Sequence, residues 1–168
     1  MKIGITDIEG NNLYDNITLF HCAWIIDVIT GERWGFRPHQ LGEYCDKLSE
    51  FDVLVFHNGI DFDCPALKKL NGVLKTKTIF DTIVLSRILE PDRLVGHSLK
   101  AWGKALGILK GEFGQDEGED VWEVFTEDMY EYCEQDVVVT LALYLHLCGL
   151  AGFDPHNPPS ISLDWDEF

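Results

Sequence analysis

The stretch Asp52–Asp63, with the sequence DVLVFHNGIDFD, decides the expected fold. Its first part, Asp52–Phe56, is an apolar run of strand length, which is typical of a strand buried on both faces. His57-Asn58-Gly59 follows as a turn signature. A helix is expected after the turn, to about Leu70, because Pro65 is tolerated only in the first turn of a helix. This order predicts an α/β domain with helices on both faces of a sheet.

The flanking sequence predicts a mixed central sheet. Lys2–Ile8 is expected to be the first strand, and Ile17–Ile29 and Trp34–Phe36 are expected to complete an antiparallel meander with it. The strand at Asp52–Phe56 would then lie parallel to the first strand. The remaining expected elements are a helix at Leu41–Phe51, a short strand at Lys77–Phe80, and helices at Thr82–Leu89, Ser98–Leu106 (with Ser98 as its cap) and Phe125–Cys148. Gly111–Asp120 is rich in glycine and acids and is expected to be a mobile loop.

The first strand ends in two carboxylates, Asp7 and Glu9. Alternate side chains of a strand point to the same face, so these two lie side by side. Neighbouring carboxylates repel one another unless a cation lies between them, and Mg²⁺ and Mn²⁺ prefer such oxygen ligands. The alternative is a polar strand end that leads into a turn at Gly10-Asn11-Asn12.

A second acidic motif follows the buried strand. Asp63 is expected in the first turn of the next helix, near the carboxyl end of the strand, where open α/β sheets bind their ligands. Asp61 is expected to be the N-cap of that helix. Capping is also an alternative reading of Asp63.

The third motif lies on the long helix at Phe125–Cys148. Tyr132 and Asp136 are separated by four residues and therefore share one helix face. Asp136 precedes the apolar run Val137–Val139, which indicates a partly buried carboxylate, and such a group is costly unless it is paired or bound to metal. The alternative for Tyr132 is an amphipathic core tyrosine.

Taken together, the three motifs resemble those of the DnaQ-like (DEDD) exonuclease superfamily in its tyrosine form. Further blocks resemble the N-terminal proofreading domain of T-seven-type phage family-A DNA polymerases. These blocks are Phe20-His21-Cys22, Val55–Gly59, Pro65-Ala66-Leu67, Asp81–Arg87, Ala101-Trp102-Gly103 and Gln135–Thr140. The resemblance covers about residues 1–150 and implies a ribonuclease H-like fold and 3′→5′ exonuclease activity.

This resemblance also implies a mechanism, namely phosphodiester hydrolysis with two divalent cations, Mg²⁺ or Mn²⁺, that releases 5′-mononucleotides. Asp7 would bridge both cations, Glu9 and Asp136 would complete one site, and Asp63 would hold the second. Tyr132 would orient the attacking water. The residues expected to contact substrate are His57 and Asn58 at the terminal nucleotide, and Phe62 and Leu13 stacked or wedged against the terminal bases. Core packing or an apolar loop remains the alternative for these substrate contacts.

The expected organisation is an exonuclease domain at 1–150 and a Pro-containing acidic tail at 151–168. No polymerase domain follows, so we expect a free-standing exonuclease in preference to a piece of a longer chain. Its expected partners are the single-stranded 3′ end of DNA and a separately encoded polymerase. An RNA-directed member of the superfamily and a non-catalytic module that binds a protein partner are the alternatives.

Charge is the feature that opposes nucleic-acid binding, since the chain has 13 basic and 29 acidic residues and a net charge of −16. The charges are segregated, however. Residues 68–110 carry nine Lys/Arg against three acids, whereas residues 111–168 carry fifteen acids and no Lys or Arg. The basic stretch is expected to meet substrate phosphates, with a solvated lysine face as the alternative.

Composition narrows the class of protein further. No apolar run approaches the ~20 residues that span a membrane, and Met1-Lys2 leads directly into the first strand without a signal peptide. The five cysteines have no CxxC spacing and are expected to be reduced thiols. We therefore expect a cytoplasmic protein, in the host cytoplasm if the chain is phage-encoded.

Overall fold

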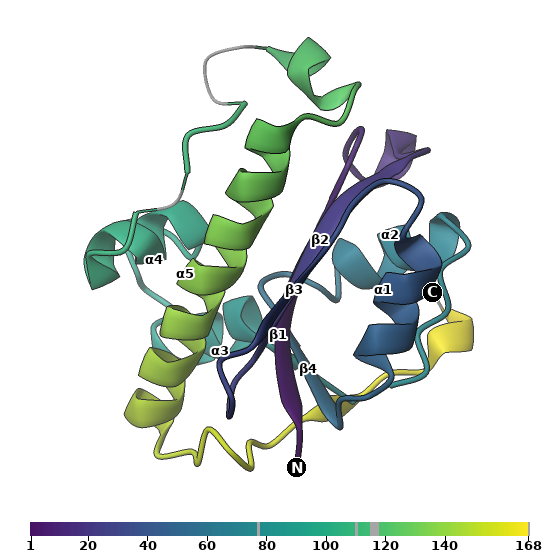
Figure 1. The fold of residues 1–168 in the computed structure, drawn as a ribbon. Coiled ribbons are helices and arrows are strands. Elements are labelled where there is room, and N and C mark those ends of the chain that lie inside the picture. The colour runs from purple at the N-terminus through teal and green to yellow at the C-terminus, as the bar shows by residue number, and fades with distance from the viewer. Residues whose placement is uncertain (77, 110, 115–117, 168) are drawn as a thin grey trace.

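The computed structural model describes residues 1–76, 78–109, 111–114 and 118–167. Its centre is a six-stranded sheet of order β3-β2-β1-β4-β5-β6 (Figure 1). The strands are β1 (Ile3–Gly10), β2 (Phe20–Asp27), β3 (Arg33–Phe36), β4 (Val53–Phe56), β5 (Thr78–Asp81) and β6 (Ile161–Ser162). β1 pairs antiparallel with β2 and parallel with β4, and β5 continues the parallel part. The expected meander and the expected parallel strands are thus both confirmed.

Five helices flank the sheet in the described part of the chain. They are α1 (Leu41–Leu48), α2 (Asp63–Lys69), α3 (Thr82–Leu89), α4 (Leu99–Leu106) and α5 (Glu127–Ala151), with 3₁₀ turns at Tyr14–Asn16, Glu119–Trp122 and Trp165–Glu167. Ser98 caps α4 as expected, because its side chain accepts a hydrogen bond from the Ala101 N–H. Thr126 caps α5 in the same way, through the Met129 N–H.

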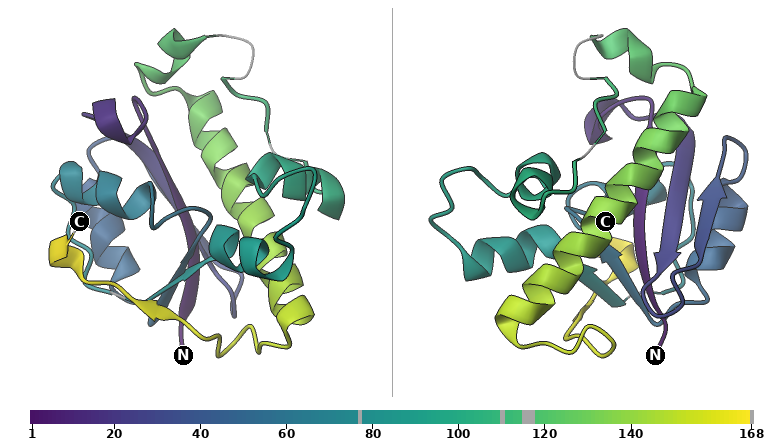
Figure 2. Two further views of the ribbon diagram at one scale, coloured as in Figure 1. Left: turned by 180° about the vertical axis from the view of Figure 1, so that it is seen from behind. Right: turned by 60° about the vertical axis from the view of Figure 1, so that its left-hand side comes forward.

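Each face of the sheet carries its own core. α1 and α2 cover one face, and α3, α4 and α5 cover the other (Figures 1 and 2). Along β4, Leu54 packs in the core with α1 and α2, whereas Val53 and Val55 pack in the core with α3, α4 and α5. Because successive side chains of a strand alternate between faces, a strand buried on both sides must be apolar throughout. This explains the continuous apolar run at β4.

Several predicted boundaries were wrong. The strand expected at Ile17–Ile29 is the shorter β2, and the helix expected at Leu41–Phe51 already ends at Leu48. Phe51 instead lies after the helix and packs into the core beside β4. Phe51 follows Leu48 at the helical spacing of three residues, so periodicity alone overextends the helix.

Two predictions fall partly outside the described residues. The short strand expected at Lys77–Phe80 is β5, and Lys77 lies outside the described residues. In the loop expected at Gly111–Asp120, residues 115–117 lie outside them. The described end of that segment forms the 3₁₀ turn Glu119–Trp122.

Residues 151–168, expected as a tail, contribute to the sheet. β6 pairs antiparallel with β5 through Ser162 and Ile161. Leu163 and Trp165 pack against the core on the α1 and α2 face, and Lys68 donates to the Trp165 carbonyl at 2.7 Å. The segment therefore crosses the edge of the sheet and packs on the domain.

α5 is long and apolar enough to cross a membrane by length and composition, contrary to the expectation from sequence. Half of its most apolar window is buried inside the domain, where Val137, Leu143 and Leu147 share a core with residues of β1, β2 and β4. A buried core helix passes the same test, so this is weak evidence for a membrane. All five cysteines are free and buried, as expected for reduced thiols.

Candidate active site

The candidate site lies where the carboxyl end of β1 meets the first turn of α2. The Ile8 backbone N–H, between Asp7 and Glu9, donates to Asp63 Oδ1 at 3.1 Å. Asp63 is only 1% exposed. The parallel pairing of β1 with β4 places both strand ends at one edge of the sheet, so the turn after β4 delivers Asp63 beside the first motif. The first and second motifs are therefore in contact.

α5 brings the third motif to the same place through Cys133. The Cys133 Sγ lies 3.6 Å from the Asp7 carbonyl oxygen and 4.0 Å from Asp7 Oδ2. One ligand atom each of Asp7, Glu9 and Cys133 lie within 4.8 Å of one another. Asp136 follows Cys133 by three residues and so lies on the same helix face, where it is 4% exposed.

Tyr132 lies within a group of aromatic rings at the end of this helix. Its ring centroid is 5.8 Å from that of Phe113 and 6.0 Å from that of Trp122. Phe113 and Trp122 also meet edge to face at 5.1 Å. Phe113 and Trp122 lie in the segment before α5, for which the sequence predicted no helix or strand. Their rings support the position of Tyr132.

Electrostatics at Asp63 suit a cation site. The pKa of Asp63 is raised to about 7, chiefly by burial and also by the nearby Asp81 charge, against the opposing effect of hydrogen bonds from the Ile8 N–H and with the Asp7 side chain. An ionised carboxylate is costly in this desolvated position unless positive charge compensates it. Three buried or half-buried carboxylates that meet here, at Asp7, Glu9 and Asp63, form a donor set of the oxygen type that Mg²⁺ and Mn²⁺ prefer.

Asp81 is a carboxylate that sequence reasoning did not place in the site. It ends β5, and it accepts from the N–H groups of Asn58 at 2.8 Å, Ile60 at 3.1 Å and Ile83 at 3.1 Å. Burial raises its pKa, and these backbone hydrogen bonds oppose the rise. Asp81 therefore fixes the turn after β4, in which Asn58 adopts a left-handed backbone with φ of 67°. The signal was available, because Asp81 directly precedes an expected helix in the manner of an N-cap.

The turn held by Asp81 explains why the expected cap at Asp61 was wrong. α2 begins at Asp63, Phe62 occupies the N-cap position, and no side-chain hydrogen bond caps the helix. Asp61 is exposed. Because Asp81 binds the turn from the neighbouring strand, the chain reaches α2 one residue later than a cap at Asp61 requires.

A pocket of about 430 Å³ adjoins the acidic residues. Its described lining combines apolar and amide side chains, namely Glu9, Gly10, Asn11, Asn12, Leu13, Asn58, Phe62 and Trp122. The structure thus gathers Leu13, from the segment after β1, with Asn58 and Phe62, from the turn after β4. His57 is not among these lining residues, and its Nδ1 lies 2.8 Å from the Thr82 hydroxyl instead. Trp122 is an addition that the sequence did not reveal.

Comparison with known proteins identifies the family of the chain. Residues 34–149 match a family described as 3′-5′ exonuclease. The chain belongs to the 3′–5′ exonuclease family. It is 36% identical to the DNA-directed DNA polymerases of Enterobacteria phage T3 and Escherichia phage T7, over 94% of this chain and 28% of each polymerase. The chain thus spans little more than a quarter of the length of these relatives.

A solved structure shows the same fold. Brucella melitensis NrnC superposes with a TM-score of 0.65 at 18% identity, covering 89% of this chain and 74% of that one. The expected ribonuclease H-like fold of the DnaQ-like exonucleases is confirmed. The family match begins at residue 34, so Asp7 and Glu9 lie outside the matched residues.

Proposed function

We propose that this exonuclease removes 5′-mononucleotides from the 3′ end of single-stranded DNA, using Asp7, Glu9, Asp63, Asp136 and Tyr132. The observation that carries the proposal is the hydrogen bond from the Ile8 N–H to Asp63, together with the Asp7–Cys133 contact. These contacts join three motifs that lie more than 50 residues apart in sequence. A binding module would have no chemical reason to gather buried carboxylates in this way.

The carboxylates would hold two divalent cations, Mg²⁺ or Mn²⁺. Such cations would activate water for attack and neutralise charge on the phosphate. Asp7 lies close to Glu9 and Cys133 and interacts with the Asp63 side chain, so it would hold the cations together with these carboxylates. Asp63 and Asp136 would complete the two sites. The Tyr132 hydroxyl would orient the water, while Phe113 and Trp122 restrict the movement of its ring.

The adjoining pocket would bind the terminal nucleotide. Leu13, Phe62 and Trp122 offer apolar surfaces to a base, and the amides of Asn11, Asn12 and Asn58 offer hydrogen bonds to its edge or to the sugar. Glu9 lines the same pocket, so the bound nucleotide would lie next to the acidic residues. His57 would act indirectly, by supporting the turn that carries Asn58.

The two phage relatives support a proposal for the biological setting. We propose a role in phage DNA replication in the host cytoplasm, with proofreading or degradation of DNA as the task. The related region belongs to a DNA polymerase in both phages. A polymerase, either separately encoded or part of a longer chain, is the proposed partner.

A comparison of labelled oligomers tests this function. The protein is incubated with Mg²⁺ and single-stranded DNA that carries a label at the 5′ or at the 3′ end, beside matched RNA. We expect 5′-labelled DNA to shorten progressively, 3′-labelled DNA to release a labelled mononucleotide first, and EDTA to stop both. Release of 5′-terminal nucleotides would contradict the polarity. Faster loss of RNA than of DNA would replace the DNA substrate with RNA.

A further inference from the structure

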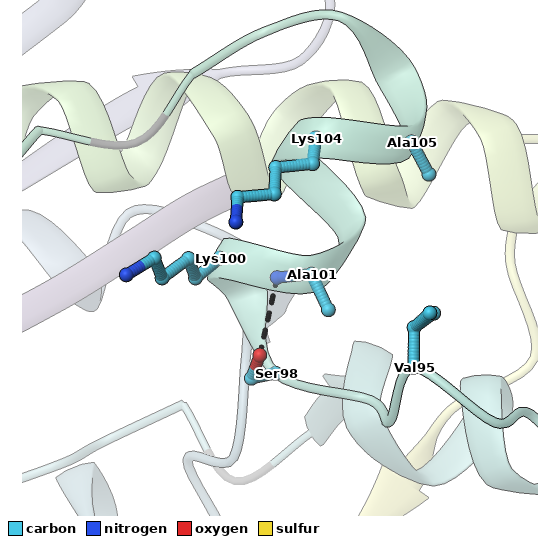
Figure 3. A pocket seen from close by; sticks show the side chains of 6 residues that line it. All are labelled: Val95, Ser98, Lys100, Ala101, Lys104 and Ala105. Carbon is cyan, nitrogen blue, oxygen red and sulfur yellow. Dashed lines mark hydrogen bonds between the residues drawn. The ribbon is translucent and has the colours of Figure 1, made fainter.

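The pocket that Glu9 and Trp122 line is held in part from β2. It shares no described lining residue with the larger hollow, of about 530 Å³, on α4 (Figure 3). The carbonyl oxygen of Trp122 lies 2.7 Å from Nε2 of His21, a residue of β2. Because a carbonyl oxygen only accepts hydrogen bonds, the Nε2–H of His21 is the donor. His21 belongs to the block Phe20-His21-Cys22, which the proposed chemistry does not involve.

His21 is the extra residue of a bulge in β2. In the antiparallel pairing with β1, Cys22 lies opposite Glu9 and Phe20 lies opposite Gly10. The register shifts between Glu9 and Gly10, so His21 is the additional residue between the two pairs. Bulges are common next to active sites, where they redirect a side chain. This bulge lies directly across from the strand end that carries Glu9.

The bulge explains how two successive residues of β2 face the same side of the sheet. Cys22 packs with Met129 of α5. Strict alternation along a strand would then direct His21 to the opposite face. The extra residue shifts the alternation, and His21 instead donates to the turn Glu119–Trp122, which precedes α5. The hydrogen bond joins residues 101 positions apart, and His21 is only 4% exposed.

Trp122 connects this hydrogen bond to the candidate site. Its ring lines the pocket together with Leu13 and Phe62, and the ring centroid lies 6.0 Å from that of Tyr132. A shift of the Trp122 backbone would therefore move an apolar wall of the pocket. Tyr132 would be affected less, because its ring also packs on Phe113. Loss of the His21 hydrogen bond should thus weaken binding of substrate more than it slows the chemical step.

We propose that His21 is a positioning residue for substrate, which fixes the Trp122 ring where it contacts the 3′-terminal nucleotide. The proposal rests on the proposed function, because it assigns the support of the same pocket. His21 is not among the described lining residues of this pocket, so it acts through Trp122. Its contribution to affinity should therefore vanish when the Trp122 ring is removed.

The test compares His21→Asn with His21→Gln. The amide nitrogen of Gln reaches the position of Nε2, whereas the shorter Asn side chain ends near the position of Nδ1 and loses the Trp122 carbonyl. Tyr144→Phe is the control, because it removes a hydrogen bond to another backbone carbonyl, that of Pro155, from a residue about 18 Å along α5 from Tyr132.

Each variant is made with and without Trp122→Ala. Fluorescence anisotropy with Ca²⁺ in place of Mg²⁺ gives the Kd for a labelled single strand of DNA. Steady-state cleavage with Mg²⁺ gives KM and kcat, and thermal unfolding gives the melting temperature. Together these measurements separate a loss of substrate binding from a general loss of stability.

We expect His21→Asn to bind the strand on the order of fivefold more weakly, with a parallel rise in KM and a smaller change in kcat. His21→Gln should bind like the wild type. In the Trp122→Ala background, His21→Asn should cause no further loss of affinity, since the wall that it holds is gone. Tyr144→Phe should keep the wild-type Kd even where its melting temperature falls.

Wild-type affinity of folded His21→Asn, or an equal loss with and without the Trp122 ring, would overturn the role of His21. If His21→Asn does not fold, His21→Gln decides, because a weaker Kd that persists in the Trp122→Ala background would also overturn it. Failure of the wild type to cleave a strand that it binds would instead overturn the proposed function. The effect of His21 on binding would then still be measurable.

Discussion

The Ile8 backbone N–H donates to the Asp63 carboxylate at 3.1 Å, so the strand that carries Asp7 and Glu9 is joined directly to the helix that carries Asp63. Three acidic side chains from two elements are thereby held around one point. Asp63 is buried, and burial raises its pKa to about 7. Ionised Asp63 therefore destabilises the folded protein when no cation is bound, and a bound cation would compensate this cost.

This relationship predicts how the stability of the metal-free protein depends on pH. The Asp63 pKa is about 7 in the folded state and about 3.9 in an unfolded chain. The unfolded state therefore releases this proton first, and folding loses stability as pH rises from about 4 to about 7. We expect Asp63→Asn in EDTA to gain stability relative to wild type across this window, and the gain to level off above pH 7.

Denaturant unfolding of both proteins in EDTA at several pH values measures the difference. At pH values below 4 the two proteins should be nearly equal, because Asp63 is then protonated in both states. Added Mn²⁺ should reverse the order in stability, since only the wild type retains the full ligand set. A difference that does not change between pH 4 and 7 would contradict the raised pKa.

Asp81 should contribute to stability more than any exposed carboxylate near it. Asp81→Ala leaves the buried or partly buried N–H groups of Asn58, Ile60 and Ile83 without their acceptor, and we expect a loss of about 3 kcal/mol in the free energy of unfolding. Urea unfolding measures the loss. Asp61→Ala is the matched control and should change stability by less than about 0.5 kcal/mol. A larger effect at Asp61 would restore it as the cap.

Trp122 should affect binding of substrate more than the chemical step. Its ring lines the pocket beside Leu13 and Phe62, and loss of one base-stacking contact costs roughly 1–3 kcal/mol. We expect Trp122→Ala to raise KM for a DNA oligomer about tenfold with a smaller change in kcat, and Trp122→Phe to restore most of the affinity. Val124→Ala changes an exposed residue two positions away and should leave both constants unchanged. A loss in kcat alone would place Trp122 outside the binding pocket.

Tyr132 should act on the chemical step. Tyr132→Phe keeps the ring that packs on Phe113 and Trp122 and removes the hydroxyl that would orient water. We expect kcat to fall about 10²-fold with little change in KM or in melting temperature. Single-turnover measurements separate this from slow product release. If Tyr132→Phe were as active as the wild type, Tyr132 would be a packing residue of the core and would have no part in the chemical step.

Hydrophobic periodicity predicts best the strands and helices whose own residues alternate or repeat according to burial. The apolar run of β4 and the helix Thr82–Leu89 were predicted closely, because burial on two faces and an amphipathic turn leave clear marks in sequence. The start of α2 was predicted wrongly, because Asp81 fixes the preceding turn from 20 residues away. β6 was not predicted, since two exposed residues at a sheet edge carry no hydrophobic pattern.

For the candidate site, the sequence indicated which carboxylates to expect and in what order, and the structure shows which contacts hold them in place. The sequence motifs predicted that Asp7, Glu9 and Asp63 belong to one site. The hydrogen bond from the Ile8 N–H and the contact of Cys133 with Asp7 depend on tertiary packing and were not predicted. Leu13 and Phe62 were expected near the substrate, whereas Trp122 comes from a segment without periodicity. Local patterns in a single sequence do not show which distant segments come into contact, so these features of the site could not be predicted.

The most direct test of the central claim is the rate at which Mg²⁺-loaded protein shortens a 5′-labelled single strand when one carboxylate at a time is neutralised. Asp61→Asn, an exposed carboxylate two residues before Asp63, is the matched control. The account predicts that Asp7→Asn abolishes shortening while retaining the wild-type fold by circular dichroism, and that Asp61→Asn shortens DNA at the wild-type rate. Undiminished shortening by Asp7→Asn would contradict the assignment of this site.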